Sequence, residues 1–328
     1  MSDRLADYLY ELPAKLVANR PAKHREDSRM LILDRKSGAI EHRRFLDLPG
    51  YLSPRDLLVL NDSKVIPARL FDTTGKLEIL LLEKQNEREW TALVNPGKKM
   101  RPGHVVETAG TSAKVLEILE DGTRRIEFAS APDLEHYGTM PIPPYFNRKA
   151  DEEDRERYQT VYASEEGSVA APTAGLHFSK ELLSRLPHTF VTLHVGVGTF
   201  RPVKTEDLTQ HLMHKEHYTL AEATTRVITE AKEMGGRIFA VGTTTARVLE
   251  SQPPGTLTPS IGSTEIFIRP PYQFRHIDSL LTNFHLPGST LLMLVSAMAG
   301  RELILSAYAE AVKEEYRFFS YGDCMLIL

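Results

Sequence analysis

The sequence changes in character twice along its length, and this change restricts the fold more than any other feature. From about residue 68 to about residue 144, short apolar segments of strand length alternate with turn signals such as Arg101-Pro102-Gly103 and Asp121-Gly122. Short strands at such regular spacing are typical of a small barrel or sandwich. An Asp-Gly pair between two alternating runs also predicts a hairpin. The strands predicted here are 77–82, 90–94, 104–107, 114–119 and 124–128.

Outside this segment, strand signals alternate with helix signals, as in an α/β layer. A proline-rich stretch at 141–144 ends the first pattern, and the charged run at 149–157 is predicted to be a solvated linker or helix. The elements predicted after it are strands at 190–193, 237–241, 264–268 and 280–282, and helices at 222–234, 245–251, 289–299 and 302–316.

The first 65 residues contain two further predicted strands, at 30–33 and 57–60, which have no partner of their own. We therefore predict a discontinuous α/β domain, with a layered mixed sheet and helices, made from residues 1–67 and 150–328. A small β-barrel domain, residues 68–149, is predicted to be inserted in it.

Composition excludes several classes of protein. The single cysteine, Cys324, excludes an intrachain disulfide and a cysteine-based zinc site. The apolar runs are too short to cross a bilayer, and the N-terminus has no apolar signal-peptide core, so we expect a cytoplasmic chain without membrane contact. A net charge of −4 gives no general attraction to nucleic acid, but it leaves room for a local basic face.

Gly242 and three threonines lie between a predicted strand and a predicted helix. Free N–H groups and the helix dipole make such a turn an anion site, and capping alone needs only one of the threonines. We expect Thr243 and Thr244, with Arg247 in the following helix, to bind a ligand.

Several histidines lie beside glycines or at strand ends. Strand alternation predicts that Thr192, His194 and Gly196 share one face, which suits a flat ligand, although a structural histidine is the alternative. Asn283 and His285 follow a strand at the edge where α/β sheets bind ligands.

The motif HLMHKEH repeats histidine every three residues, at His211, His214 and His217. Because it lacks a carboxylate cage, we predict no metal site there. Proton transfer by His214, oriented by Glu216, is the preferred interpretation.

Basic residues cluster in three places. Each cluster alone is compatible with ordinary solvated surface, but together they predict a face that contacts phosphates. The residues are Arg20, Lys23 and Arg25; Arg43 and Arg44; and Lys98, Lys99 and Arg101.

Long motifs spread over nearly the whole chain resemble the S-adenosylmethionine:tRNA ribosyltransferase-isomerases of queuosine biosynthesis. The motifs are DSRMLILDR (27–35), DLLVLNDSKVIPARL (56–70), MPIPPYF (140–146), RYQTVYA (157–163), GSVAAPTAGLHF (167–178), TLHVGVGTFRPV (192–203), HLMHKEH (211–217), AVGTTTARVLES (240–251), TNFHLPGSTLLMLVSAMAGRE (282–302) and YRFFSYGD (316–323).

The resemblance implies an α/β fold with an inserted barrel, and a reaction without a resident cofactor. S-adenosylmethionine would be a consumed co-substrate. Its ribosyl part would be transferred to 7-aminomethyl-7-deazaguanine at the wobble position of a tRNA anticodon and isomerised, giving epoxyqueuosine-tRNA, adenine and methionine. No obligate protein partner is implied. The alternatives are an S-adenosylmethionine-dependent RNA methyltransferase and a tRNA-binding protein without catalysis.

Such a reaction needs general acids and bases, for which histidines and a carboxylate are suited. We assign this role to His177, His194, His214, Glu216 and His285, and expect the four histidines to border one pocket. The residues assigned to substrate binding are Asn61, Asp62, Arg69, Thr173, Gly175, Gly196, Gly198, Thr199, Arg201, Thr243, Thr244, Arg247 and Asn283. The three basic clusters are assigned to tRNA.

Overall fold

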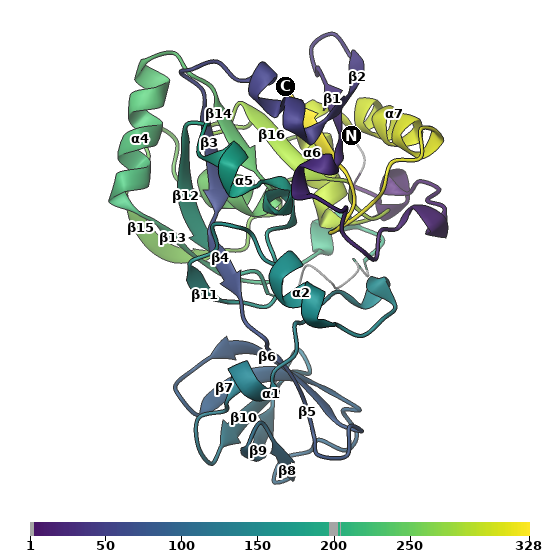
Figure 1. Cartoon of the computed structure of the whole chain (residues 1–328), viewed down its shortest axis with the longest axis vertical. Helices are drawn as coiled ribbons and strands as arrows, with labels where there is room; N and C mark the ends of the chain where they lie inside the picture. Colours follow the sequence, from purple (N-terminus) through teal and green to yellow (C-terminus); the bar gives the residue numbers. More distant parts are fainter. Residues whose placement is uncertain (1–2, 197–202, 204) are drawn as a thin grey trace.

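The computed structural model describes residues 3–196, 203 and 205–328, which form a large α/β body with a small barrel beside it (Figure 1). A mixed nine-stranded sheet runs through the body in the order β15-β13-β12-β3-β14-β16-β17-β1-β2. Its strands are β1 (Arg29–Leu33), β2 (Ile40–Arg44), β3 (Leu57–Asn61), β12 (His188–Leu193), β13 (Glu216–Leu220), β14 (Ile238–Val241), β15 (Ser260–Thr264), β16 (Ser279–Asn283) and β17 (Cys324–Ile327).

The central strands of this sheet are parallel and buried. Strand β3 pairs in parallel with β12 and β14, and β14 pairs in parallel with β16. Every residue of β3 and β14 is buried, which explains why both read as continuous apolar runs. The carboxyl ends of these parallel strands therefore meet along one edge of the sheet.

Each face of the sheet has its own core. Leu57 and Val59 pack on one face with buried residues of the longer helices. Leu58 and Leu60 pack on the other, with the 3₁₀ segment Phe45–Tyr51 and the short helix α3. The helices are α1 (Leu134–Tyr137), α2 (Glu152–Arg157), α3 (Lys180–Leu183), α4 (Glu222–Glu233), α5 (Thr243–Glu250), α6 (Thr290–Ala299) and α7 (Arg301–Lys313).

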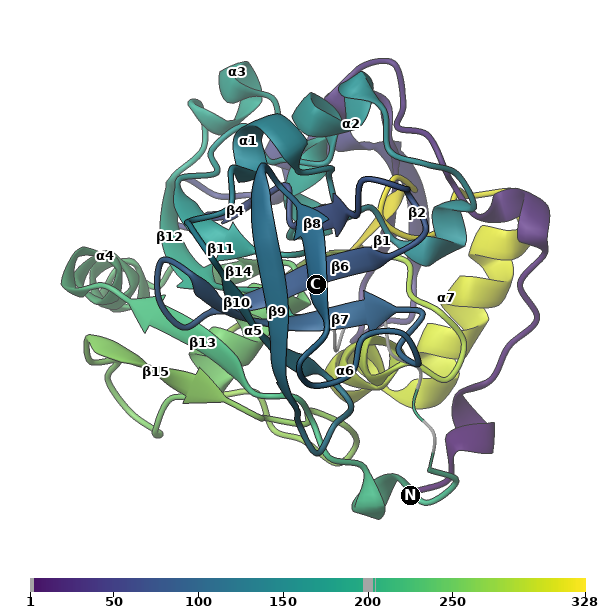
Figure 2. The same ribbon diagram turned by 90° about the horizontal axis from the view of Figure 1, so that it is seen from below.

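A second, six-stranded sheet forms the barrel. All of its pairings are antiparallel, and a bridge between Asp72 and Thr108 brings the two edge strands together, so the barrel is nearly closed. Figure 2 shows these strands in front of the larger sheet. They are β5 (Arg69–Phe71), β6 (Glu78–Lys84), β7 (Glu89–Asn95), β8 (Val105–Thr108), β9 (Thr111–Ile118) and β10 (Arg124–Phe128).

A two-stranded parallel sheet of β4 (Ser63–Val65) and β11 (Glu165–Ser168) lies in the segments that flank the barrel in sequence. The fold class is thus confirmed: a mixed α/β sheet with helices, and an inserted antiparallel barrel. The domain boundaries at 67/68 and 149/150 stay a prediction. Within the described part of the chain, no single helix is long and apolar enough to cross a membrane; α6 and α7 together meet that test but are bent by 113° at their junction.

One predicted strand is wrong. Residues 264–268 were expected to be extended and paired, but β15 covers Ser260–Thr264. It pairs with β13 from Leu220 opposite Ser260 to Glu216 opposite Thr264, and this pairing stops where β13 begins. The charged run at 149–157 contains helix α2, one of its two predicted forms. It is not solvated throughout, because Asp154 is buried and bonded to Arg148.

Candidate active site

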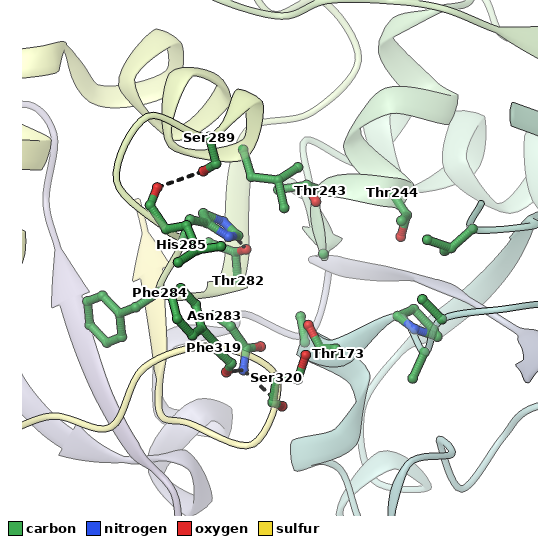
Figure 3. Close-up of a pocket in the computed structure, with 18 of the residues that line it drawn as sticks. Thr173, Thr243, Thr244, Thr282, Asn283, Phe284, His285, Ser289, Phe319 and Ser320 are labelled. Carbon is green, nitrogen blue, oxygen red and sulfur yellow. Dashed lines mark hydrogen bonds between the residues drawn. The ribbon is translucent and has the colours of Figure 1, made fainter. Parts of the chain in front are cut away.

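A cavity opens at the carboxyl ends of β14 and β16 (Figure 3), the edge at which α/β sheets bind ligands. Most of its lining comes from four segments that are distant in sequence. These are residues 170–174, 242–244, 282–291 without 287 and 288, and 319–320, joined by Tyr145, Tyr158 and Val195.

Helix α5 begins at this cavity. Its first flanking residue, Gly242, has φ 88°, which favours glycine, and no side chain caps the helix. Thr243 and Thr244, which were expected to bind a ligand, line the cavity, and the buried Thr244 Oγ1 has no hydrogen-bond partner. Thr245 instead donates to Val241 O at 2.9 Å. An uncapped helix start beside a free hydroxyl is suited to hold an anionic group.

Asn283 ends β16 and lines the cavity. Its Nδ2 donates to Phe319 O at 2.8 Å and to Ser320 O at 3.4 Å (Figure 3). Its Oδ1 lies 3.3 Å from Nε2 of His177, whose Nδ1 lies 2.8 Å from Ser28 Oγ. Burial lowers the pKa of His177 to about 4. This histidine is therefore neutral at pH 7, and both of its ring nitrogens are engaged.

His285 is the histidine that lines the cavity. Its Nε2 lies 3.0 Å from Thr282 Oγ1, its backbone N–H donates to Tyr308 OH at 3.0 Å, and its carbonyl accepts from Tyr10 OH. Burial lowers its pKa to about 3, so it is neutral at pH 7. Because hydrogen bonds fix the main chain of His285, its neutral imidazole is positioned to accept a proton from a bound ligand or to form a hydrogen bond with it.

His177, His194 and His214 lie outside the lining of this cavity, so the expectation that all four histidines border one pocket is wrong. Strand β12 ends at Leu193, and Val195 rather than His194 reaches the cavity. His194 packs against Gly167. A Cβ added to Gly167 would lie 3.1 Å from Nδ1 of His194. Burial lowers the pKa of His194, and Glu165 opposes this shift. His214 is exposed.

Glu216 and Arg247 form a buried ion pair outside the cavity lining. Burial raises the pKa of Glu216, against the effect of Arg247 and of the Gly196 N–H that the carboxylate accepts. Arg247 Nε and Nη2 are buried and have no partner. The pair joins α5 to β13, which is a different position from the one expected for either residue.

Three of the other predicted substrate-binding residues make contacts within the protein. Asn61 is buried and bonds both the N–H and the carbonyl of Leu193. Asp62 accepts from Thr192 Oγ1 at 2.7 Å. Arg69 lies 3.4 Å from Glu78 in an ion pair.

Gly175 is required by packing, because a Cβ there would lie 2.0 Å from Tyr162 OH. Thr173 lines the cavity. Gly198, Thr199 and Arg201 lie outside the described residues.

The basic clusters differ in how their charges are used. Arg20 pairs with Asp151, Arg25 donates to the carbonyls of Leu176 and Glu156, and Arg43 pairs with Glu41 at 2.6 Å. The exposed basic residues that remain are Lys23, Arg44, Lys98, Lys99 and Arg101. Strand β2, which carries Arg44, and the barrel, which carries Lys98, lie at opposite ends of the molecule (Figure 1).

Sequence reasoning missed part of the cavity lining, namely Tyr145, Tyr158, Phe319 and Ser320. Tyr145 OH lies 2.5 Å from Ser320 Oγ, a contact across 175 positions in sequence. All four residues lie in the recognised motifs MPIPPYF, RYQTVYA and YRFFSYGD, which was the available signal. Among the described residues no three His, Cys, Asp or Glu side chains are placed to hold a metal ion.

Known proteins are similar to this chain over its full length. A family model described as a queuosine biosynthesis protein matches residues 5–327. The S-adenosylmethionine:tRNA ribosyltransferase-isomerase of Acetivibrio thermocellus is 49% identical over 341 residues, covering 99% of each chain. That of Symbiobacterium thermophilum is 51% identical over 342 residues, covering 99% of this chain and 100% of the relative.

A solved structure of a protein with the same kind of name is also similar to this chain in sequence and fold. The crystal structure of the S-adenosylmethionine tRNA ribosyltransferase from Thermotoga maritima is 40% identical, covers 98% of this chain and 100% of that one, and superposes with a TM-score of 0.57.

Fold and cavity together define an α/β enzyme with an inserted barrel. The chain belongs to the queuosine biosynthesis protein family. The predicted family, enzyme class and ribosyl transfer from S-adenosylmethionine to tRNA are confirmed by these comparisons.

Proposed function

We propose that the cavity at the ends of β14 and β16 binds S-adenosylmethionine and consumes it. The ribosyl part is transferred to 7-aminomethyl-7-deazaguanine at the wobble position of a tRNA anticodon and isomerised there, and adenine and methionine leave. The observation that carries this assignment is the uncapped start of α5 in a cavity of a chain from this family. We expect the reaction in the cytoplasm, with no resident cofactor.

The N-terminus of α5 determines the orientation in which we place S-adenosylmethionine in the cavity. The carboxylate of the methionine part is placed at the first N–H groups of α5 and at the hydroxyls of Thr243 and Thr244, because helix N-termini favour negative charge. The free Thr244 Oγ1 is then satisfied by the ligand. The ribose and adenine extend toward the side of the cavity lined by Asn283, His285 and Phe319.

The chemistry requires a base near the ribose. The sulfonium acidifies the adjacent C5′ proton, and the attacking ammonium of the tRNA base must also lose a proton. Among the described residues that line the cavity, His285 is the one with an imidazole or carboxylate, so it is our candidate for this role. Asn283 and the Tyr145–Ser320 hydroxyl pair supply neutral hydrogen-bonding groups.

The tRNA is too large for the cavity and must also contact the surface. We assign its phosphate contacts to the exposed cations Lys23, Arg44, Lys98, Lys99 and Arg101. Arg20, Arg25 and Arg43, which already have partners in the structure, are weaker members of the same prediction.

A double-label experiment tests the proposal. The enzyme is mixed with tRNA that carries the aminomethyl base and with S-adenosylmethionine labelled in the ribose or in the methyl group. We expect ribose label in the tRNA, and free adenine and methionine in equal amounts. Methyl label in the tRNA would assign a methyltransferase instead, and tRNA binding without loss of S-adenosylmethionine would assign a binding protein. Unmodified tRNA is the control, with which no adenine should be released.

A further inference from the structure

Phe319 holds a backbone conformation that an aromatic residue rarely adopts. Its φ is 72°, in the left-handed region, although it is a bulky residue and is only 6% exposed. A bulky side chain in this region is an outlier, and such residues gather at functional sites. The strained residue lies on the wall of the cavity, beside Tyr145, with 4.9 Å between the two ring centroids.

A chain of buried hydrogen bonds holds Phe319 in this conformation. Its carbonyl accepts from Asn283 Nδ2 at 2.8 Å and from the N–H of Gly322 at 2.9 Å. Asn283 Nδ2 also reaches Ser320 O, so both amide protons point at carbonyls and Oδ1 must face His177. The orientation of the Asn283 amide therefore fixes the turn that carries the Phe319 ring.

The hydrogen bonds also fix the tautomer of His177. Because Asn283 Oδ1 can only accept, His177 Nε2 must carry the proton and donate it. Its Nδ1 is then an acceptor for the hydroxyl of Ser28. With the opposite tautomer, a nitrogen lone pair would face the amide oxygen, and the hold on Asn283 would be lost.

We propose that the ring of Phe319 is the stacking face for a purine-type base in the cavity, and that His177 is the positioning residue that holds it there through Asn283. This inference rests on the proposed function, which brings two such bases to the cavity: the adenine of S-adenosylmethionine and the 7-deazaguanine of the tRNA. Both have the flat face that an aromatic side chain stacks against. The same lining includes the small side chains of Ala171 and Ala174.

Two leucine substitutions test the stacking face. Phe319→Leu keeps an apolar side chain and removes the ring, whereas the control Phe318→Leu changes its fully buried neighbour, which packs against Phe284 and Tyr308. Phe319→Leu should raise one KM by roughly 5- to 150-fold, the worth of stacking one base. A raised KM for S-adenosylmethionine identifies adenine as the stacked base, and a raised KM for tRNA identifies the deazaguanine. Phe318→Leu should change only the melting temperature.

Substitutions of His177 test the positioning role. His177→Leu should raise the same KM as Phe319→Leu, and His177→Gln, which keeps a donor and an acceptor, should restore most of it. The double variant should have the KM of Phe319→Leu alone, because both changes remove one interaction. If His177→Leu lowers the melting temperature and leaves both KM values unchanged, the histidine is only structural and the positioning role is overturned.

A measurement on the unaltered enzyme covers the case in which the variants do not fold. Free adenine and free 7-aminomethyl-7-deazaguanine are compared with cytosine as inhibitors of the double-label reaction. Inhibition by a purine-type base but not by cytosine is expected, and equal inhibition by all three overturns the stacking face. If the unaltered enzyme puts no ribose label into tRNA, the proposed function fails. If it does so and Phe319→Leu has unchanged KM values, only the present inference fails.

Discussion

The guanidinium of Arg247 donates from Nη1 to the carboxylate of Glu216 inside the α/β body. Helix α5 supplies the arginine and strand β13 the glutamate, and the same carboxylate accepts the N–H of Gly196. One ion pair thus connects the helix that begins at the cavity, an outer strand of the sheet, and the chain beyond β12.

Glu216→Ala should therefore destabilise the fold strongly. It leaves the Arg247 charge buried without a counter-ion, and removing one partner of a buried pair costs about 3–5 kcal/mol. The measurement is the free energy of unfolding in urea at pH 7. Glu233→Ala, at an exposed position of α4, is the control and should change it by less than about 0.5 kcal/mol.

Replacing both partners by apolar residues of similar size, Glu216→Leu with Arg247→Met, should cost less than Glu216→Ala alone, since no charge is then left buried. If the double variant has a lower free energy of unfolding than Glu216→Ala, the ion pair stabilises the fold by more than apolar packing at the same positions does.

Local patterns in the sequence predicted most of the fold. The run Leu57–Leu60 indicated a buried strand, and the period of residues 222–234 indicated α4, because both signals depend only on neighbours in the chain. Strand β17 was missed although it lies between β16 and β1 in the sheet. Its four residues at the chain end have no alternation that separates them from a loop, and only their distant partners make them a strand.

The candidate site was predictable in part for the same reason. Thr243, Thr244, Asn283 and His285 were found because helix starts and strand ends can be recognised locally. His194 was placed on the wrong side because the expected alternation stops with β12 at Leu193. No local pattern marks Phe319, since its position depends on a hydrogen bond from Asn283, 36 residues away in sequence, and only its place in the motif YRFFSYGD indicated it.

Thr243→Val together with Thr244→Val should weaken the binding of S-adenosylmethionine. Valine removes each hydroxyl at nearly constant volume, and losing a hydrogen bond to a charged group costs about 1.5–3 kcal/mol, which raises KM by roughly 10- to 150-fold. The affinity for tRNA should hardly change. Thr245→Val is the matched control, because its hydroxyl donates to the carbonyl of Val241 at the end of β14, and it should affect stability only. An unaltered KM would show that neither hydroxyl contributes to the binding of S-adenosylmethionine.

Acid should destabilise the enzyme partly through His177. Burial lowers its pKa in the folded state to about 4 from an ordinary 6.5, so the unfolded chain takes up the proton first as the pH falls. The stabilisation is complete above pH 6.5 and is lost as the pH falls toward 4. Between pH 7 and pH 5 the loss is about 2 kcal/mol.

Urea unfolding at several pH values measures this effect. His177→Gln should flatten the pH dependence of the unfolding free energy by that amount, whereas His104→Gln, at an exposed position in the barrel, should leave it as in the unaltered enzyme. Equal slopes for all three proteins would mean that His177 is not held neutral by burial.

Reversing the charge of Lys98 and Lys99 should weaken tRNA binding. Both side chains are exposed in the barrel loop between β7 and β8. For each phosphate contact that is lost, the slope of log K for tRNA binding against log salt concentration should become shallower by about one. Arg43→Glu with Arg44→Glu tests the other end of the molecule and should leave the fold intact. Lys232→Glu, on α4, is the control, and unchanged affinity in both double variants at low salt would place the tRNA on another face.

His285→Ala should lower kcat by roughly two to four decades, the usual worth of a positioned acid or base. The folded structure and the affinity for tRNA should be largely retained, which thermal unfolding and a binding titration can check. His104→Ala is the control for loss of a histidine. If His285→Ala keeps more than about a tenth of the kcat, the base is not His285, and the substrate's own amine becomes the candidate, since no other described residue of the cavity lining carries an imidazole or a carboxylate.

The pH profile of the unaltered enzyme tests the same residue independently. Because burial lowers the pKa of His285 to about 3, its imidazole is neutral throughout the neutral range. As a base in the free enzyme it should therefore impose no fall in kcat/KM as the pH is lowered from 8 to about 5.5. A fall with an apparent pKa near 6.5 that is absent in His285→Ala would show that this histidine titrates as an accessible one. A fall that persists in His285→Ala would assign the titration to a different group.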